Sequence, residues 1–480
     1  MILITENHSF KYDMENLAEI FFPYEKIKVL GELSGEKDNI TVITRACGNE
    51  ISVEAFVFEK HKIKRQSVSS QSDIRSMLSI LFYEVMSDIT GLDYPWGILY
   101  GVRPARFMHS LDAKYSKEKA EEIFKNQYLV SESKISLVRR VAENENKIIS
   151  LSRSDSCSLY VSIPFCPSRC AYCSFVSHSI ENASGLVDSY VALLVRELQD
   201  LSAYIKNNNL RLETIYFGGG TPTSLSAENL SKIFEAIKNN FDLSALREYT
   251  VEAGRPDTVT PEKLIAIKNA GAQRISINPQ SFNDDVLHAV GRRHTSKQTL
   301  EAYRLAEEIG FDNINMDFIA GLPADNFNSF KSSIETAVSL NAPSITVHTL
   351  SLKSGAFMAS PEGEFKACST ELTSQMVDFS RAFLTDSGYE PYYMYRQGKC
   401  VGNLENVGWC KKGYECLYNV FMMDETHTVF AVGAGGVTRL KNQKTGKIER
   451  IYNYKYPYEY IRSFDEILKR KEYIDSFYSD

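Results

Sequence analysis

The segment Tyr160-Val-Ser-Ile-Pro-Phe-Cys-Pro-Ser-Arg-Cys-Ala-Tyr-Cys-Ser-Phe175 places three cysteines, Cys166, Cys170 and Cys173, on one short stretch of chain. Three thiolates in such a segment can ligate three irons of a [4Fe–4S] cluster. The fourth iron then has no protein ligand and is open to a small molecule. The aromatic side chain of Tyr172, directly before the third cysteine, supports this interpretation.

A structural zinc site is the main alternative for these cysteines. A closed zinc site takes four ligands in paired Cys-x2-Cys or Cys/His groups. Only His178 lies close by in the sequence, and no second cysteine pair follows. The spacing therefore favours the cluster over zinc or over three unrelated core cysteines.

The composition describes an ordinary globular protein. The chain has 480 residues, enough for two or three domains, with 43% apolar and 24% charged residues. The net charge of -7 argues against a general nucleic-acid binder. No apolar run is long enough to span a bilayer, the N-terminus has no basic signal peptide, and nine cysteines form no disulfide framework. We therefore expect a cytoplasmic protein.

Residues 1–150 are expected to form a small N-terminal α/β accessory domain. The β-rich segments are 40–45, 51–58 and 62–68, the first two joined by a turn at Gly48-Asn49. Apolar residues then recur at helical spacing from Ile74 to Ile89, and Gly91 follows where a helix C-cap belongs. Charged helical segments from about 116 to 149 lead to the polar stretch 152–156, the expected boundary.

Residues 151–355 are expected to form a core barrel of alternating strands and helices. The predicted strands are 159–163, 214–217, 249–253, 275–278, 314–319 and 344–349. The predicted helices are 187–204, 227–239, 261–269, 297–308 and 329–339. This order predicts a parallel sheet in a partial (β/α)6 TIM-like barrel, with residues 356–480 as a C-terminal α+β extension that covers the substrate. The cysteine segment follows the first strand, on the side where such barrels carry their chemistry.

Further polar residues follow successive predicted strands. Gly218-Gly-Gly-Thr-Pro-Thr223 comes after the second strand, where glycines allow close backbone approach and Thr221 or Thr223 can cap the next helix. Such a turn is equally common as an ordinary strand–helix junction. Glu252 ends the third strand and can accept hydrogen bonds from a ligand, or pair with Arg255 as a rim residue.

Three more candidates follow the later strands. Gln280 lies after the fourth strand, Arg292 lies beyond the helix that follows, and Asp317 ends the fifth. An arginine fork suits a carboxylate, and a carboxylate at a strand end suits two ribose hydroxyls. Each residue alone is more often part of a salt bridge or cap, but together their order behind successive strands indicates one ligand site.

Residues 160–323 closely resemble the oxygen-independent coproporphyrinogen III oxidase group of radical S-adenosylmethionine (SAM) proteins. The matching motifs are Ile163-Pro-Phe-Cys, Gly218-Gly-Gly-Thr-Pro-Thr, Arg274-Ile-Ser-x-x-x-Gln-Ser-Phe and Asp317-x-Ile-x-Gly-Leu-Pro. The segments 96–104, 393–397 and 402–408 resemble the longer HemZ-type branch, coproporphyrinogen dehydrogenase. The likeness covers most of the chain and is least specific over the first ninety residues.

The resemblance implies roles for individual residues. Cys166, Cys170 and Cys173 would ligate the cluster, whose open iron chelates SAM. Gly219, Gly220 and Thr221 would contact the amino end of SAM, with Glu252 nearby, and Arg292 would bind its carboxylate. Gln280 and Asp317 would hold the ribose. Tyr160, Tyr172 and Ile319 would line the cluster and nucleoside pocket.

The implied activity is the oxidative decarboxylation of coproporphyrinogen III propionates to the vinyl groups of protoporphyrinogen IX. A SAM-derived radical would remove a hydrogen atom from the propionate β-carbon, with electrons from an unidentified low-potential donor. Two positions depart from the pattern: Ser162 stands where many relatives have His, and Phe175 stands where the bacterial oxidase branch has Cys. The first removes any proton-transfer role of that side chain, and the second leaves the three ligands unaffected.

Two other functions remain open within the same fold. A haem-binding chaperone of the HemW type would carry His-Asn-x-x-Tyr-Trp after a cysteine, but Cys416 is followed by Leu417-Tyr418-Asn419 and the histidine is replaced by Tyr418. A radical methyltransferase that modifies haem or porphyrin is the second. Cys400, Cys410 and Cys416 can be an auxiliary cluster site, although their spacing favours ordinary buried thiols.

Overall fold

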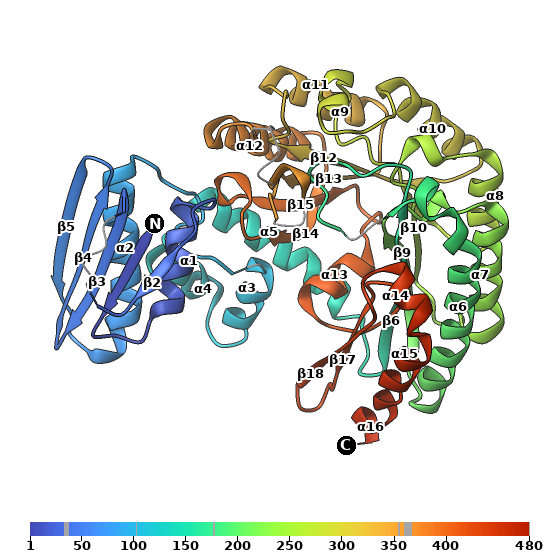
Figure 1. Cartoon of the computed structure of the whole chain (residues 1–480), viewed down its shortest axis with the longest axis horizontal. Coiled ribbons are helices and arrows are strands. Elements are labelled where there is room, and N and C mark those ends of the chain that lie inside the picture. The colour runs from blue at the N-terminus through green and yellow to red at the C-terminus, as the bar shows by residue number, and fades with distance from the viewer. Residues whose placement is uncertain (33–37, 102, 176–177, 354–355, 360–366, 480) are drawn as a thin grey trace. The chain divides into compact units, whose positions relative to one another are not determined.

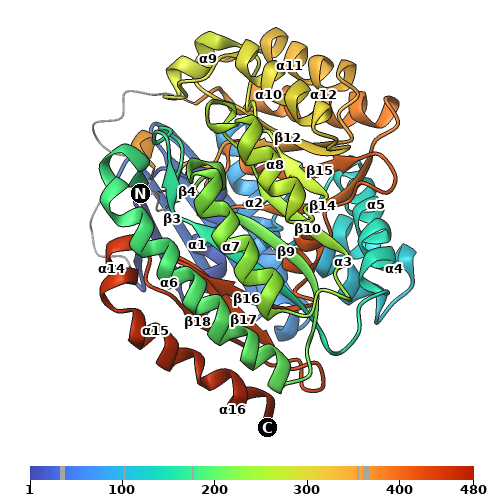
Figure 2. The same ribbon diagram turned by 90° about the vertical axis from the view of Figure 1, so that its right-hand side faces the viewer.

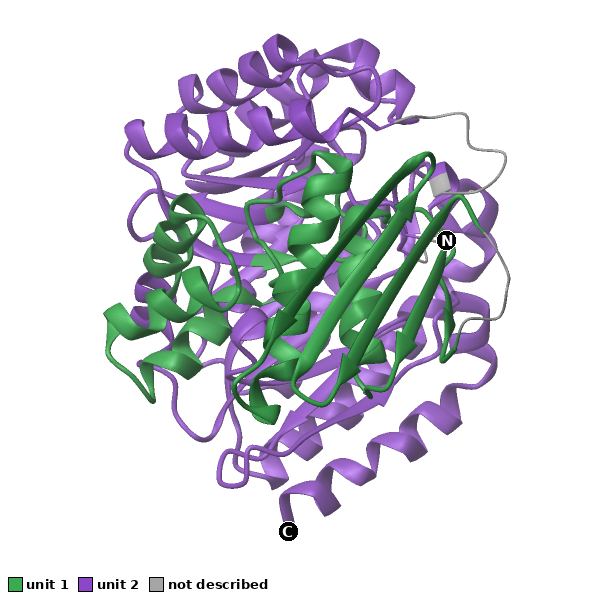
Figure 3. Ribbon diagram, turned by 90° about the vertical axis from the view of Figure 1, so that its left-hand side faces the viewer, with its two compact units in different colours: residues 1–142, 395–405 green, residues 143–394, 406–480 purple. Residues whose placement is uncertain are grey.

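The computed structural model describes residues 1–32, 38–101, 103–175, 178–353, 356–359 and 367–479. Contacts divide the chain into two compact units (Figure 3). Unit 1 comprises Met1–Ala142 and Tyr395–Glu405, and unit 2 comprises Glu143–Met394 and Asn406–Asp480. The expected boundary at 150/151 thus lies eight residues beyond the observed division, and residue 355, at the second expected boundary, is outside the described residues. The assignment of three functional regions stays a prediction, since residues 406–480 cluster with the barrel.

Unit 1 contains a five-stranded sheet in the order β2-β1-β3-β4-β5. The strands are β1 (Ile2–Glu6), β2 (Lys28–Leu30), β3 (Ile40–Cys47), β4 (Glu50–Val57) and β5 (Lys60–Ser67). The hairpin turns at Gly48-Asn49 as predicted, because Cys47 and Glu50 are paired across it. Helix α2 (Ile74–Thr90) ends at Gly91, whose φ of 74° is the left-handed conformation that favours glycine at this position. Strand β1, which pairs with β3 in parallel, and helix α1 (Lys11–Phe21) were not predicted from the sequence.

The remaining helices of this part of the chain are α3 (Pro104–Asp112), α4 (Lys117–Asn126) and α5 (Glu132–Ile149), and η1 (Gln71–Asp73) is a 3-10 turn. The motif at 96–104 has a structural role in the fold, although Val102 is outside the described residues. The indole of Trp96 donates to Glu405 at 2.7 Å, and Lys134 donates to the other carboxylate oxygen at 2.7 Å. Both partners of this ion pair are 1% exposed, so the pair needs these hydrogen bonds to offset its desolvation.

Unit 2 is built on the six parallel strands that the sequence predicts. They are β6 (Ser156–Ile163), β9 (Arg211–Gly219), β10 (Glu248–Glu252), β11 (Arg274–Ser276), β12 (Asn313–Ala320) and β13 (Ser344–Thr349). They lie side by side in chain order within an 11-stranded sheet, β14-β15-β13-β12-β11-β10-β9-β6-β16-β17-β18 (Figure 1). The sheet order is open at both ends, which confirms a partial barrel.

Helices cover the outer face of these strands, and Figure 2 shows α6, α7 and α8 across it. They are α6 (Ile180–Asn207), α7 (Ala227–Asn240), α8 (Pro261–Asn269), α9 (Asp284–Ala289), α10 (Ser296–Glu308), α11 (Phe327–Ser339) and α12 (Thr370–Asp386). The short elements β7 (Phe165–Cys166), β8 (His178–Ser179), η2 (Pro222–Ser224), η3 (Pro256–Thr258) and η4 (Phe357–Ala359) lie in the loops. The hydroxyl of Ser226 caps α7, so the expectation that Thr221 or Thr223 would cap this helix was wrong.

The C-terminal residues extend the barrel sheet at both edges. Antiparallel β15 (Glu405–Cys410) pairs with β13 and is followed in the sheet by β14 (Glu390–Arg396). At the other edge β16 (Thr428–Val432) runs parallel to β6, with β17 (Val437–Lys441) and β18 (Ile448–Tyr452) beyond it. Gly433 follows β16, and a side chain there would meet the Ser162 carbonyl oxygen at 2.4 Å. The remaining elements are η5 (Val401–Asn403), α13 (Leu417–Asp424), α14 (Pro457–Arg462), α15 (Phe464–Lys471) and α16 (Tyr473–Ser479).

No helix of the described residues has both the length and the apolar character that crossing a bilayer requires.

Candidate active site

The barrel strands are almost entirely buried, and their partly exposed residues concentrate near the C-terminal ends. Five such residues lie at alternate positions of the strands, which share one face of the sheet: Tyr160 in β6, Tyr216 in β9, Glu252 in β10, Asp317 in β12 and His348 in β13. Three of them, Tyr160, Glu252 and Asp317, are predicted site residues. The strand order brings these side chains to one end of the barrel, where chemistry is expected.

The cysteine loop after β6 is fastened to the glycine turn after β9. The Thr221 backbone N–H donates to the Phe165 carbonyl at 2.7 Å, and the Gly220 N–H donates to the Ile163 carbonyl at 2.7 Å. The Thr221 hydroxyl donates to the Cys166 sulfur at 3.5 Å. The sequence predicted that these two motifs act together, and the structure brings them into contact.

The absence of a side chain at Gly220 is required at this contact. An added Cβ would lie 2.6 Å from the Phe165 carbonyl oxygen and 3.0 Å from the Cys166 sulfur. At Gly219 the φ of 106° favours glycine, and an added Cβ would lie 3.0 Å from the Ser162 hydroxyl. The turn therefore brings bare backbone up to a cysteine sulfur.

Cys173 lies within electrostatic range of the other two cysteines. Burial, together with the charges of Cys170 and Cys166, raises the pKa of Cys173 to about 11, although a hydrogen bond from the Phe175 backbone opposes this rise. Within the described residues, no three His, Cys, Asp or Glu side chains are grouped to hold a metal ion. A [4Fe–4S] cluster attaches each thiolate to a different iron, so this site does not need three ligands on one ion. The three thiols on one loop, with the Cys166 sulfur in contact with Thr221 and next to the position of a Gly220 side chain, fit such a cluster.

The carboxyl group of Glu252 is held by a neighbouring strand and is not paired with a base at the rim. The Tyr216 hydroxyl donates to it at 2.6 Å, whereas Arg255 pairs with Asp257. Burial raises the pKa of Glu252 to about 7, the Tyr216 hydrogen bond lowers it, and the charge of Asp317 raises it. The alternative of an Arg255 partner is therefore not what the structure shows.

Asp317 stays ionised in the same environment. Burial raises its pKa, but the hydrogen bond and charge of His348 and the hydrogen bond of Asn315 outweigh burial and hold the pKa below the usual value. Asn315 donates to the carboxylate at 2.6 Å, and the His348 Nε2 lies 3.8 Å from it. Two carboxyl groups with pKa values pushed in opposite directions thus face the barrel interior.

Gln280 and Ile319 are joined to Asp317 through the backbone. The Gln280 N–H donates to the Asp317 carbonyl at 2.9 Å, and the Ile319 N–H donates to the Gln280 carbonyl at 3.2 Å. Gln280 has a φ of 67°, an uncommon conformation for a residue other than glycine. Its side-chain oxygen is buried without a hydrogen-bond partner, as is the Asn278 oxygen. Buried orphan acceptors next to Asp317 fit a ligand that carries hydroxyl or amine donors.

Arg292 is buried beside the cysteine loop. Its guanidinium donates to the Tyr172 hydroxyl at 3.0 Å and to the Gly254 and Asn278 carbonyls at 2.9 and 2.8 Å. The Nε of Arg292 has no partner. The predicted residues Tyr172 and Arg292 are thus brought together, and one donor of the guanidinium remains for a ligand.

Three tyrosine rings are stacked at the barrel interior. Tyr216 lies 6.3 Å from Tyr160 and 4.6 Å from Tyr418 between ring centroids, with interplanar angles of 18° and 22°. Tyr418 is 4% exposed and its hydroxyl has no partner. Tyr418 therefore packs as part of the barrel lining.

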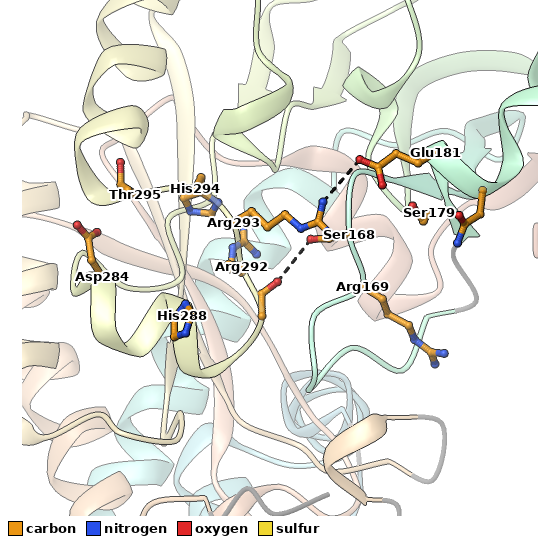
Figure 4. Close-up of a pocket in the computed structure, with 12 residues that line it drawn as sticks. Ser168, Arg169, Ser179, Glu181, Asp284, His288, Arg292, Arg293, His294 and Thr295 are labelled. Atoms are coloured by element: carbon orange, nitrogen blue, oxygen red, sulfur yellow. Dashed lines mark hydrogen bonds and ion pairs between the residues drawn. The ribbon is translucent and has the colours of Figure 1, made fainter. Parts of the chain in front are cut away.

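A cavity of about 840 Å³ opens beside the cysteine loop (Figure 4). Its walls are Ser168, Arg169, Ser179, Glu181, Asn182, Asp284, His288, Gly291, Arg292, Arg293, His294 and Thr295. Burial and nearby arginines lower the pKa of His294 to about 3, so this histidine is neutral. Of the predicted site residues, this lining includes Arg292. Glu252, Gln280 and Asp317 are not part of it, so the cavity lies beside the predicted ligand site and does not contain it.

Other candidates lie elsewhere. Cys410 and Cys416 are buried thiols whose pKa values burial raises, and Cys416 donates to Glu248 at 3.4 Å. Both thiols are 0% exposed, which suits packing in the core better than metal ligation. Cys400 belongs to unit 1.

Tyr216 and Asn278 were not predicted from the sequence as site residues, and Arg255 and Tyr418 were considered only in other roles, as a partner of Glu252 and as the replacement of a histidine. Tyr216 had a readable signal, because it is two residues before Gly218 on the strand face that also carries the glycine turn. The others had none, because their neighbours come from distant parts of the chain.

Comparison with known proteins agrees with this arrangement. The family model of the radical SAM superfamily matches residues 160–337. The chain is 35% identical to the oxygen-independent coproporphyrinogen-III oxidase-like protein HemZ of Bacillus subtilis, over 97% of this chain and 95% of that protein. It is 33% identical to the heme chaperone HemW of Bacillus subtilis, over 58% of this chain and 70% of that protein.

Among solved structures, the coproporphyrinogen III oxidase HemN of Escherichia coli, a radical SAM enzyme, matches with a TM-score of 0.52 and 20% identity. The match covers 68% of this chain and 72% of that chain, which supports the same fold. The similarity to HemZ over almost the full length of both chains shows the family as well as the fold. The chain therefore belongs to the radical SAM superfamily, in its HemZ group of oxygen-independent coproporphyrinogen-III oxidase-like proteins.

Proposed function

We propose that this protein is a radical SAM oxidoreductase that decarboxylates the propionates of coproporphyrinogen III to the vinyl groups of protoporphyrinogen IX without oxygen. The observation that carries the proposal is the contact between Cys166 and the Gly220-Thr221 turn, 55 residues later in the chain. This contact joins a thiol loop to backbone that can reach a ligand. Full-length similarity to a protein named for coproporphyrinogen oxidation supports the substrate class.

Cys166, Cys170 and Cys173 would hold the [4Fe–4S] cluster, and SAM would bind at its open iron. When bound, the cluster and SAM supply hydrogen-atom abstraction from an unactivated carbon, which amino-acid side chains cannot perform. An unidentified low-potential donor would supply the electron that cleavage of SAM needs, and a one-electron acceptor would take the electron that the substrate loses with CO2. Because such a cluster is labile to oxygen, we place the protein in a reducing cytoplasm.

The chain's own residues would bind SAM and orient it. The Gln280 side-chain oxygen and the ionised Asp317 would accept hydrogen bonds from the ribose hydroxyls, since both lie next to each other through the Gln280–Asp317 backbone bond. Gly219, Gly220 and Thr221 would contact the amino end of SAM, with Glu252 nearby, and the free Nε of Arg292 would reach its carboxylate. Tyr160, Tyr172 and Ile319 would line the pocket and exclude water.

A haem chaperone is the alternative that partial similarity to HemW raises. Its expected axial histidine is replaced by Tyr418, which is 4% exposed and stacked on Tyr216. Its hydroxyl oxygen, the atom with which a tyrosine ligates haem iron, is buried. This observation favours the oxidoreductase.

The test is anaerobic turnover of chemically reduced coproporphyrinogen III by the reconstituted full chain with SAM and dithionite. The proposal requires the products protoporphyrinogen, CO2 and 5′-deoxyadenosine, and a Cys166→Ala/Cys170→Ala/Cys173→Ala variant serves as the control without a cluster. Tight haem binding without CO2 release would instead establish the chaperone. A methylated tetrapyrrole with no CO2 would establish a methyltransferase.

A further inference from the structure

Arg255 contacts the cysteine loop from a position that the proposed function leaves unused. Its Nη1 donates to the Cys170 sulfur at 3.8 Å, a distance suited to the large sulfur acceptor, and to the Ser168 carbonyl at 3.2 Å. Its Nη2 donates to the Ser168 hydroxyl at 3.1 Å. Arg255 is 4% exposed, so solvent does not compete for these donors.

The orientation of this guanidinium is fixed from its other edge. The Asp257 carboxylate accepts from Nε and from Nη2, both at 3.0 Å, in a bidentate pair. The backbone is also held, because the Thr258 N–H and hydroxyl donate to the Arg255 carbonyl at 2.9 and 2.7 Å. The Asp257 pair and the backbone hydrogen bonds therefore fix the direction in which Nη1 donates to the Cys170 sulfur.

We propose that Arg255 is a positioning residue that raises the reduction potential of the cluster by donating a hydrogen bond to the Cys170 sulfur. This inference rests on the proposed function in one respect, that Cys170 ligates the cluster. Reduction adds an electron to the cluster and increases negative charge on its sulfurs. Because Asp257 offsets the charge of the guanidinium, the effect comes from the N–H that donates to the sulfur. Such a donor stabilises the reduced form more than the oxidised form, and hydrogen bonds to ligand sulfurs are known determinants of potential.

A purely structural role is the competing explanation. Arg255 also binds Ser168, so its loss can loosen the loop between Cys166 and Cys170. Such loosening would change the amount of cluster bound. It would not change the potential of the clusters that remain, so the midpoint potential at full iron content separates the two roles.

The experiment compares Arg255→Met, Arg255→Lys and wild type, each reconstituted as the full chain without SAM. Iron content is measured first, and dithionite titration followed by electron paramagnetic resonance (EPR) gives the midpoint potential. In Arg255→Met we expect the ratio of reduced to oxidised cluster at the wild-type midpoint to fall about tenfold, equivalent to about 59 mV for one electron. Arg255→Lys should fall between, because the charge remains without the fixed donor geometry.

Arg293→Met is the matched control. Arg293 lies on a neighbouring loop, its side chain is 65% exposed, and it pairs with Glu181 at 3.6 Å (Figure 4). Solvent and salt screen an exposed charge, so removing it should leave the midpoint unchanged. An equal shift in this control would mean that net charge, and not the hydrogen bond from Arg255, sets the potential.

An unchanged or higher midpoint in Arg255→Met at full iron content would overturn the inference and leave the proposed function intact. Failure of the wild-type chain to take up the cluster would instead overturn the proposed function. If Arg255→Met cannot retain iron, wild type labelled with ¹⁵N in the arginine guanidinium decides the matter by pulsed EPR. The reduced cluster should then show a ¹⁵N coupling that Arg255→Lys loses, and the lack of this coupling in wild type would refute the contact.

Discussion

The hydroxyl of Tyr216 donates a 2.6 Å hydrogen bond to the carboxyl group of Glu252 across the neighbouring strands β9 and β10. This bond favours the ionised carboxylate, while burial opposes ionisation more strongly and raises the pKa of Glu252 to about 7. Near neutral pH the group therefore exists in both forms. A ligand that brings N–H donors or positive charge would shift it to the carboxylate.

Binding of SAM is accordingly expected to strengthen as pH rises. Below pH 7 Glu252 is mostly protonated and must lose a proton to accept hydrogen bonds from the ligand, whereas above pH 7 it is already ionised. The affinity should increase by up to about tenfold between about pH 6 and pH 8 if the carboxylate form alone binds. Calorimetry in buffers of different ionisation enthalpy measures both the affinity and the proton released.

Glu252→Gln supplies the control for this pH dependence. The amide keeps an acceptor for Tyr216 but does not titrate, so its SAM affinity should be low and flat over the same range. A slope that persists in Glu252→Gln would assign the titration to another group.

Asp317→Ala should weaken SAM binding without loss of the cluster. The carboxylate is ionised and held by Asn315, so it is fixed to accept hydrogen bonds from a diol. Loss of hydrogen bonds to a charged group costs about 1.5–3 kcal/mol, or roughly 10- to 100-fold in affinity. Asp325→Asn, a buried carboxyl in the loop after β12, is the matched control with unchanged affinity. Equal SAM affinity in Asp317→Ala and wild type would rule out the ribose contact.

Gly220→Ala should reduce cluster content. The new methyl group would lie 2.6 Å from the Phe165 carbonyl oxygen, so the cysteine loop must move away from the glycine turn. Overpacking of this kind costs about 1–3 kcal/mol. Gly185→Ala in α6 meets no atom within 4 Å and should be neutral or stabilising. Iron per chain and thermal midpoints distinguish the variants, and equal iron content in both would contradict the proposed fit.

Replacement of Cys166, Cys170 and Cys173 by alanine should abolish iron binding, whereas wild type should take up about four irons per chain. Cys410→Ala is the control, because that thiol is fully buried in β15 and is not part of the cysteine loop. Iron quantification and visible absorbance after anaerobic reconstitution measure the outcome. Absorbance retained in the triple variant would show that other residues ligate the metal.

The sequence predicted the barrel well because its signals are local. Each of the six strands is a short apolar run before a glycine or polar turn, and a helix follows each of the first five, as predicted. The candidate site residues were predicted for a related reason, since strand ends of a parallel sheet meet at one edge. Glu252 and Asp317 needed no information beyond their position in the chain.

Long-range packing explains what the sequence did not predict. The apolar run Val429–Val432 pairs with β6 as a further parallel strand, and nothing in the run specifies that partner. Arg255 contacts Cys170, which lies 85 residues earlier in the chain. The sequence does not indicate this contact, because Asp257, two residues away, is an obvious partner for the same guanidinium. Arg255 lies three residues after Glu252 and is therefore a natural partner in the sequence, yet the hydrogen bond comes from Tyr216 on another strand.

Tyr418 provides a test of the chaperone alternative and of the aromatic stack together. Its ring lies 4.6 Å from Tyr216 and its hydroxyl is buried without a partner. Tyr418→Phe should therefore be neutral or stabilising by up to about 1 kcal/mol, because it removes an unsatisfied polar group. Tyr418→Ala should cost about 3–5 kcal/mol through the cavity it leaves. Thermal midpoints of the two variants check this difference.

Tyr418→His restores the residue type that the chaperone motif carries, in a matched position. In the wild type the Tyr418 ring packs against Tyr216, and its centroid lies 6.1 Å from that of Tyr160. The imidazole would be enclosed by the same two rings, so haem should not gain access to it. Haem titration followed by absorbance is expected to be the same for this variant and for wild type. A new Soret band of stoichiometric intensity in Tyr418→His would mean that the ring position opens to a porphyrin. Residue 418 would then be a position that can bind haem, and the chaperone alternative would be favoured over a packing role.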